Sequence, residues 1–258
     1  MKLKWQGVEQ TLSLLCDPAD PTKAGPPACF PGREESRKLL LGNLLFPFTN
    51  ADFAGLMGIM YWLLAMPFVL WPRWDMGIII GLIFCGAFVS YTRYQEKADR
   101  PVIYLTSLLQ GLAHTGAVLG LAHLLPHLDP HLPAFSGTYG FWWLLFTCLV
   151  EVGILGGLIG AFIFGLNLLI TSLWFDMNHN DAFSAMRLES YKNFLRLRIT
   201  DDEITVYAIG LKDMPKRSEW IDTHVHQGQP RYKPKTPLRP QLLERVRVVP
   251  LHRDTPLA

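Results

Sequence analysis

Long apolar runs separated by short polar segments occupy the middle of the chain. A helix needs about 20 apolar residues to cross the hydrocarbon core of a bilayer. Four runs approach or exceed this length, at 53–71, 76–91, 101–125 and 141–175. Several of them end in Trp or Tyr, as is typical of a membrane interface. The pattern predicts an all-α integral membrane protein with about four transmembrane helices, the last of which tilts or continues past the interface.

The pattern changes from helical to strand-like after the fourth run. Residues 193–199 alternate apolar and basic side chains, residues 200–203 are typical of a turn, and residues 204–209 are β-branched or aromatic in most positions. This combination predicts a small C-terminal β-hairpin. An isolated hairpin is only marginally stable in water, so we expect it to pack on another element.

The two ends of the chain differ from its apolar middle. Five prolines fall within 17–31 and indicate an irregular linker, and the charged segment that begins at Arg33 predicts an amphipathic helix running into 39–45. From residue 227, Pro, Lys and Arg predominate and favour an extended tail. We therefore divide the chain into an N-terminal linker with an amphipathic segment (1–51), a transmembrane domain (52–175), a hairpin region (176–226) and a Pro-rich basic tail (227–258).

Composition and charge support a lipid environment for the middle of the chain. Half of the 258 residues are hydrophobic and 18% are charged, against about a quarter charged in soluble domains. No Lys or Arg falls between Pro101 and Trp174. A water-facing surface of that length would normally carry basic side chains, whereas a lipid-facing surface excludes them.

The basic residues also predict an orientation. They flank the first run on its N-terminal side, occupy the loop after the second run and abound after the fourth, whereas the first loop has only Arg73 and the loop 126–140 has none. Because Lys and Arg concentrate in cytoplasmic loops, both termini and the middle loop are expected in the cytoplasm. An even number of spans agrees with this. We expect a multi-pass protein of a bacterial inner membrane and no nucleic-acid partner.

Polar and small residues mark two features within the spans. Glu151 is the one acidic residue of the fourth run, and a carboxylate in lipid is costly unless it pairs or stays protonated. His114 of the third run is a candidate partner, and a proton or substrate path is the functional alternative to a structural contact. A small-residue face that permits close helix packing, within the bundle or between copies, comprises Gly153, Gly156, Gly157 and Gly160.

Several short clusters contain metal-ligand side chains without forming a complete site. His123, His127 and His131 recur every four residues, but Pro126 and Pro130 interrupt that segment. Two other pairs of candidate ligands, one at each end of the hairpin region, are His179 with Asp181 and His224 with His226. Cys16 and Cys29 are close enough in sequence to pair. We identify no catalytic residue, no metal site and no cofactor in this chain.

Two segments carry a family resemblance. One is Cys29-Phe-Pro-Gly-Arg33 with the run from Ser36 to Phe48, and the other is Asn180 to Arg187 with Tyr191 to Arg198 and Ile204 to Gly210. Together they resemble the C-terminal membrane region of large bacterial calcineurin-like metallophosphoesterases, over roughly residues 29–220. In that family a soluble phosphoesterase domain precedes the membrane helices. The resemblance implies a hydrolase-associated membrane module.

The catalytic motifs of that family are missing here. No G-D-x-x-D occurs, and Gly42-Asn43 is followed by Leu44 where the family has His. We expect a truncated or split relative, or a separate protein that supplies the phosphoesterase domain. The leading hypothesis is a non-catalytic membrane anchor or scaffold that docks a cytoplasmic partner through the hairpin. A homo-oligomer is a further candidate assembly. The alternatives are a small transporter or channel subunit that uses Glu151, and a membrane-embedded metal-dependent hydrolase that uses His179 and Asp181.

Overall fold

The computed structural model describes residues 2–5, 8–11, 30–70, 73–95, 99–128, 137–200, 204–222 and 231–248. The chain divides into two compact units. One comprises residues 37–187 and is called the helical unit here. The other comprises residues 1–36 with 188–258 and is called the sheet unit. Each unit is described by itself.

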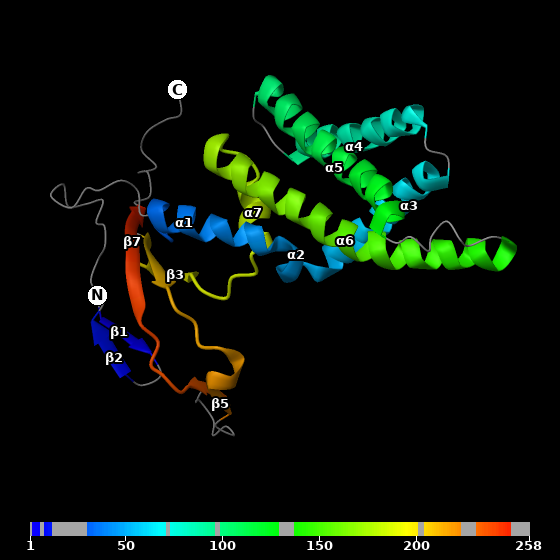
Figure 1. The fold of residues 1–258 in the computed structure, drawn as a ribbon. Coiled ribbons are helices and arrows are strands. Elements are labelled where there is room, and N and C mark those ends of the chain that lie inside the picture. The colour runs from blue at the N-terminus through cyan, green and yellow to red at the C-terminus, as the bar shows by residue number, and fades with distance from the viewer. Residues whose placement is uncertain are drawn as a thin grey trace. The chain divides into compact units, whose positions relative to one another are not determined.

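Four long helices form the body of the helical unit (Figure 1). They are α3 (Ala51–Leu70), α4 (Trp74–Gln95), α5 (Arg100–Leu128) and α6 (Gly137–Trp174). All four are long and apolar enough to cross a membrane. Their number and their positions confirm the four predicted spans to within a few residues at each end. The four helices that the sequence predicts are therefore present, each with the length and composition that a membrane span requires.

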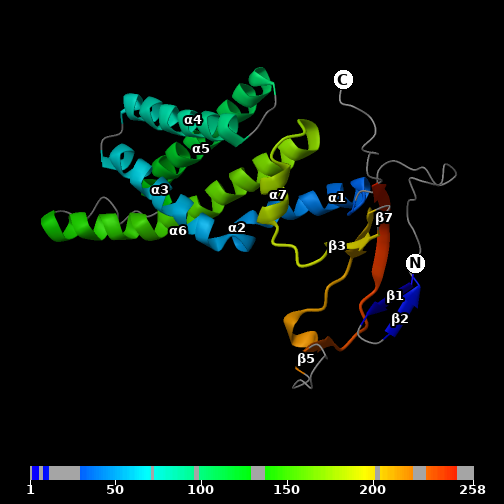
Figure 2. The same ribbon diagram turned by 180° about the vertical axis from the view of Figure 1, so that it is seen from behind.

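The fourth helix is much longer than a bilayer requires. α6 has 38 residues, or about 57 Å at 1.5 Å per residue, against a hydrocarbon core of about 30 Å. Figures 1 and 2 both show α6 extending well beyond the region where it meets α3. Within the unit, α3 packs along α6 and α4 packs along α5, while α5 also contacts α3 and α6.

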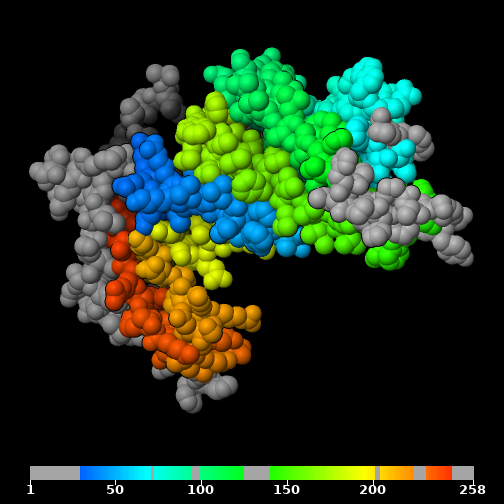
Figure 3. Space-filling model, viewed as in Figure 1, coloured from blue at the N-terminus to red at the C-terminus, as the bar shows by residue number. Residues whose placement is uncertain are grey.

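A shorter set of helices packs against one end of this bundle. The amphipathic helix α1 (Arg33–Leu40) leads through a 3-10 helix (Leu41–Leu45) into α2 (Phe46–Thr49), and α7 (His179–Ala185) follows α6. Figure 3 shows the blue segment before α3 lying against α6. Phe46, Phe53 and Phe164 hold it there, with ring centroids 4.8–5.3 Å apart. The predicted helix that begins at Arg33 is thus present.

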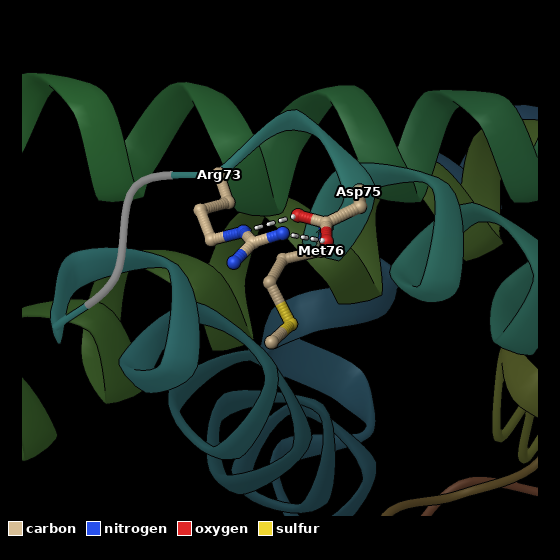
Figure 4. A network of polar contacts seen from close by, with 3 residues as sticks. All are labelled: Arg73, Asp75 and Met76. Carbon is tan, nitrogen blue, oxygen red and sulfur yellow. Dashed lines mark hydrogen bonds and ion pairs between the residues drawn. The ribbon is translucent and has the colours of Figure 1, made fainter.

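An ion pair lies at the start of α4, next to the turn that follows α3 (Figure 4). Arg73 donates to Asp75 through both Nε and Nη2, at 3.2 and 3.0 Å. The backbone N–H of Met76 donates to the same carboxylate at 3.1 Å. An acidic group in the first turn of a helix satisfies an amide that lacks an intrahelical partner and complements the helix dipole.

The sheet unit is built on a three-stranded antiparallel sheet in the order β3-β4-β7. β3 (Lys192–Ile199) and β4 (Ile204–Leu211) form the predicted hairpin, paired from Lys192↔Leu211 to Ile199↔Ile204. β7 (Pro240–Val248) pairs with the other side of β4 and has a bulge opposite Ala208/Ile209. Ile209 and Leu242 form the buried centre, with Phe194 and Tyr207 against them.

Two small antiparallel pairs complete this unit. β5 (Trp220–Asp222) pairs with β6 (Tyr232–Pro234), and β1 (Lys2–Trp5) pairs with β2 (Val8–Thr11). Neither pair is evident in the sequence pattern. The pattern predicts an extended tail from residue 227. The backbone is extended at 240–248, but it is the third strand of the sheet, so the hairpin packs on its own C-terminal segment.

Candidate functional site

A hydrogen-bonded Tyr–His pair lies in the centre of the helical unit. The Oη atom of Tyr61 on α3 and the Nδ1 atom of His114 on α5 are 2.7 Å apart, and both side chains are fully buried. Phe84 and Phe88 of α4 stack on the imidazole, with centroids 5.2 and 4.9 Å from it. Three helices therefore meet at His114. A polar pair enclosed by aromatic rings ties these helices together, at a typical gain of about 0.6 kcal/mol in membrane proteins.

Further buried polar side chains follow the same face of α5. Ser107 donates to Thr92 of α4 at 2.9 Å, and Thr115 donates to the carbonyl of Gly111 in its own helix at 2.8 Å. Two nitrogens of this face have no hydrogen-bond partner among the described residues, Nε2 of Gln110 and Nε2 of His114. A buried donor left without a partner is costly. Among the described residues, these are the two buried side-chain nitrogens of α5 that make no hydrogen bond.

Glu151 does not fill that gap. It lies half-buried on α6. The Nδ1 atom of His114 bonds with Tyr61, and Nε2 has no partner among the described residues, so a Glu151–His114 hydrogen bond is not formed. The hydrogen bond described at His114 is to Tyr61 of α3, and no hydrogen bond from Glu151 to it is among those that the structure describes. A single Tyr in an apolar run did not indicate a polar contact in the sequence.

The glycines of α6 form the contact surface with α3. A Cβ atom at Gly156 would lie 2.8 Å from the Cβ of Tyr61, and one at Gly157 would lie 2.5 Å from the carbonyl oxygen of Ala54. Gly160 faces Tyr61 and Met57 at 3.0 and 3.1 Å. Gly153 contributes its own backbone, since its carbonyl oxygen lies 2.2 Å from a Cβ built at Gly58. Within the helical unit these glycines serve contacts between its own helices.

The predicted ligand pair on α7 is divided between two different partners. His179 pairs with Asp176 at 2.8 Å, whereas Asp181 accepts a hydrogen bond from Tyr91 of α4. Asp176 and Asn178, just before α7, have left-handed backbone conformations that turn the chain back from α6. The Tyr91–Asp181 contact connects α7 to α4, whereas the His179–Asp176 pair is local to the start of α7. They do not gather ligands around one point.

No group of three or more His, Cys, Asp or Glu side chains that would hold a metal ion occurs among the described residues. His123 is exposed near the end of α5. The side chains of His127, His131, His224 and His226, and the residues Cys16 and Cys29, lie outside the part of the chain that the structure describes. The candidate pair at 224 and 226 and the candidate disulfide therefore stay predictions.

The outer strand of the sheet unit presents an exposed apolar row. Leu195, Leu197 and Ile199 point to one face of β3 and are 64, 58 and 73% exposed. They lie opposite Ala208, Val206 and Ile204 of β4. The opposite face of the sheet carries the buried Ile209 and Leu242. β3 is also an edge strand within the described sheet, so its outer N–H and C=O groups face away from β4.

The sheet unit also contains a polar cleft of about 420 Å³. Lys212 and Arg239 line it together with Asp213 and Glu219. The carboxylate of Glu35 accepts a hydrogen bond from Lys212 at 2.5 Å, which raises the pKa of that ammonium. The Glu219 carboxylate is occupied by the backbone N–H of Lys216 at 2.7 Å. Charges of both signs line this cleft, and they balance one another.

Sequence reasoning missed the residues that complete these surfaces. Tyr61, Gln110 and Gly58 gave weak signals, since each is a single polar or small residue in an apolar run. The spacing Ala54-x-x-x-Gly58 on α3 matches the small-residue spacing of α6 and offered the one usable clue.

Comparisons with known proteins give no relative from which to transfer a function. No protein-family model, no curated protein and no solved structure matches the chain. The resemblance to the membrane region of calcineurin-like metallophosphoesterases therefore depends only on the residues quoted in the sequence analysis.

Proposed function

We propose that this chain is a non-catalytic multi-pass membrane anchor that presents its sheet unit to a protein partner in the cytoplasm. One observation carries the proposal, the exposed row of Leu195, Leu197 and Ile199 on the edge strand β3. Large exposed apolar patches on soluble surfaces mark interaction sites. An edge strand of eight residues with such a row is a template for pairing with another chain unless something covers it.

The geometry of β3 favours a partner that adds a strand. In strand addition, backbone hydrogen bonds supply affinity, and pockets for alternate side chains supply specificity. β3 offers alternating leucines on one face and basic side chains, Arg196 and Arg198, on the other. A partner strand with apolar side chains facing the leucines and acidic ones facing the arginines suits this surface. The resemblance suggests a phosphoesterase domain as the partner.

The charge distribution supports a cytoplasmic location for the sheet unit. Basic residues lie before α3, around the α4–α5 loop and after α6, whereas Arg73, in the first loop, is paired with Asp75. A loop whose single cation is paired has little bias toward the cytoplasm. We therefore place both termini in the cytoplasm of a bacterial cell and the anchor in its inner membrane.

Site-specific photo-crosslinking tests the proposal in cells that make the full chain. A photoreactive amino acid replaces Leu197 in one strain and Ile221, an exposed apolar residue on β5, in the matched control. We expect position 197 to give one discrete adduct with a cytoplasmic protein that position 221 does not give, and Leu195→Lys to reduce it severalfold. Adducts with lipid alone, or the same adducts from both positions, would contradict the proposal.

Neither alternative from the sequence analysis gains a supporting observation. His114 bonds with Tyr61, and neither His114 nor Glu151 lines the polar cleft of the sheet unit. His179 and Asp181 have separate partners. The anchor hypothesis is preferred because it accounts for the exposed apolar row on the edge strand β3.

A further inference from the structure

The three-stranded sheet of the sheet unit sorts its charged side chains by face. Arg196 of β3 pairs with Tyr207 of β4, and Tyr207 pairs in turn with Arg245 of β7. Directly paired residues of an antiparallel sheet project to the same face, so two arginines that are far apart in sequence flank one tyrosine. Lys192 and Arg198 occupy alternate positions of β3 with Arg196 and share this face. We call it the basic face, and it comprises Lys192, Arg196, Arg198 and Arg245.

The acidic side chain of the same strands lies on the other face. Glu244 is the one acidic residue among the described side chains of β3, β4 and β7. It pairs with Ala208, which pairs with Leu195 of the apolar row. Arg196 and Arg198 are exposed, and neither makes a hydrogen bond or an ion pair among the described residues. The basic face therefore presents cations that the described part of the sheet leaves available.

The turn between β3 and β4 places acidic residues close to one end of this face. Residues 201–203 are Asp, Asp and Glu. Arg196 is three residues before Ile199, the last paired residue of β3, which is about 10 Å along a strand. That distance is roughly one Debye length at physiological salt. The turn therefore weakens the positive potential at Arg198 more than at Arg196.

The length of the chain limits how far the basic face lies from the first membrane helix. The Nδ2 atom of Asn50, the residue before α3, donates to the backbone carbonyl of Ala185 at the end of α7, at 2.8 Å. Ala185 therefore lies beside the point where α3 begins its candidate span. β3 begins at Lys192, seven residues later, and seven extended residues reach at most about 25 Å. The first cation of the basic face is thus tethered within that distance of the proposed membrane boundary.

We propose that the basic face binds the phosphate groups of anionic phospholipids in the membrane that anchors the chain. Guanidinium groups bind phosphate oxygens bidentately, and an anionic leaflet attracts basic residues that lie close to it. A flat array of phosphates suits cations spread over β3 and β7, whereas a strand added beside β3 would reach only the arginines of β3.

This arrangement leaves the apolar row free for the proposed partner. Leu195, Leu197 and Ile199 lie on the face opposite the arginines, so they would point away from the lipid. The inference rests on the proposed anchoring in a membrane and does not depend on the partner of β3. The two proposals can therefore fail separately, since one concerns lipid at the basic face and the other a protein at position 197.

Chemical modification of arginine tests the proposal on the full chain. The protein is reconstituted in nanodiscs, which leave both membrane surfaces accessible. They contain phosphatidylcholine alone or with phosphatidylglycerol as roughly a third of the lipid. Phenylglyoxal modifies accessible guanidinium groups, and mass spectrometry of the peptides gives the initial rate at each arginine. Arg217, which is exposed on the 3-10 helix Arg217–Glu219, is the reference within the same unit.

We expect phosphatidylglycerol to slow the modification of Arg196 about three- to tenfold relative to Arg217, the range that one or two basic residues near an anionic surface supply. High salt should remove the difference, because it screens charges at the surface. The variant Lys192→Gln/Arg198→Gln should lose at least half of the protection at Arg196. The matched control is Lys235→Gln/Arg239→Gln, which removes the same charge from exposed positions outside the three strands and should keep it.

Three results would overturn the proposal. Equal relative rates at Arg196 in the two kinds of nanodisc would show that anionic lipid does not bind there, even if the variants failed to fold. Slowing of Arg217 to the same extent would show an effect of the charged bilayer on every arginine of the unit. Slow modification of Arg196 in phosphatidylcholine alone would show that protein covers the face.

Discussion

At the scale of single residues, the contact between α3 and α6 depends on Gly58. A methyl group there would lie 2.2 Å from the carbonyl oxygen of Gly153, which is backbone and cannot yield as a side chain would. We expect Gly58→Ala to destabilise the protein by about 1–3 kcal/mol, a typical cost of overpacking. Thermal unfolding in detergent, followed by near-UV circular dichroism, measures the change.

Gly55→Ala is the matched control on the same helix, since nothing lies within 4 Å of its Cβ position. It should be neutral or stabilising by up to about 1 kcal/mol, because alanine favours helix more than glycine does. Equal behaviour of the two variants would show that α3 does not approach α6 at Gly58.

The Tyr61–His114 pair should couple α3 to α5. Tyr61→Phe removes the hydroxyl and leaves Nδ1 of His114 without its partner at 2.7 Å. A double-mutant cycle with His114→Phe should give a coupling free energy of about 0.6–1.7 kcal/mol, the range found for hydrogen bonds between transmembrane helices. Reversible unfolding in mixed micelles provides the four free energies. Additive effects of the two substitutions would exclude an energetic link between these side chains.

At the scale of elements, β7 completes the sheet that β3 and β4 begin. A chain that ends at residue 239 would lack the strand that pairs with β4 from Leu211 to Ile204. We expect its β4 amides to exchange hydrogen much faster than in the full chain, because a two-stranded hairpin is marginal in water. Hydrogen exchange read by mass spectrometry measures this, with the α3 and α6 peptides as internal controls. Unchanged protection of β4 would mean that β7 adds nothing to the sheet.

The sequence predicted some elements well and others not at all. The four long apolar helices were predictable from the sequence, because a run of about 20 apolar residues has few other stable structures. The hairpin was evident from its alternation and turn. β7 was missed because Pro and basic residues hid a short alternating run, 240–248, whose partners on β4 lie 29 to 44 residues earlier. Long-range strand pairing leaves little trace in a local pattern.

The same limit applies to the candidate sites. The glycine face of α6 was visible because small-residue spacing repeats along one helix. The partners on the facing helices, Tyr61 and Gly58, were not, because a single residue gives no period. Glu151 and His114 stood out as polar residues in apolar runs, but which polar groups meet across helices depends on rotation and tilt that composition does not fix.

At the scale of the whole molecule, we propose a helical unit in the membrane and a sheet unit that serves a partner in the cytoplasm. Four spans place both ends of the helical unit on one side. From the charge pattern we propose that this side is the cytoplasm, with the paired Arg73 of the first loop on the other side. If this orientation failed, β3 would face a compartment without the proposed partner.

Cysteine accessibility in intact cells tests this claim most directly. Single cysteines are introduced in a background without the four native cysteines, at Arg73 in the first loop, Asp99 in the second and Thr200 in the β3–β4 turn. A membrane-impermeant maleimide should label Arg73→Cys from outside, and it should label Asp99→Cys and Thr200→Cys only after the inner membrane is permeabilised. Labelling of Thr200→Cys in intact cells, or of positions 73 and 99 from the same side, would contradict the four-span anchor with a cytoplasmic sheet.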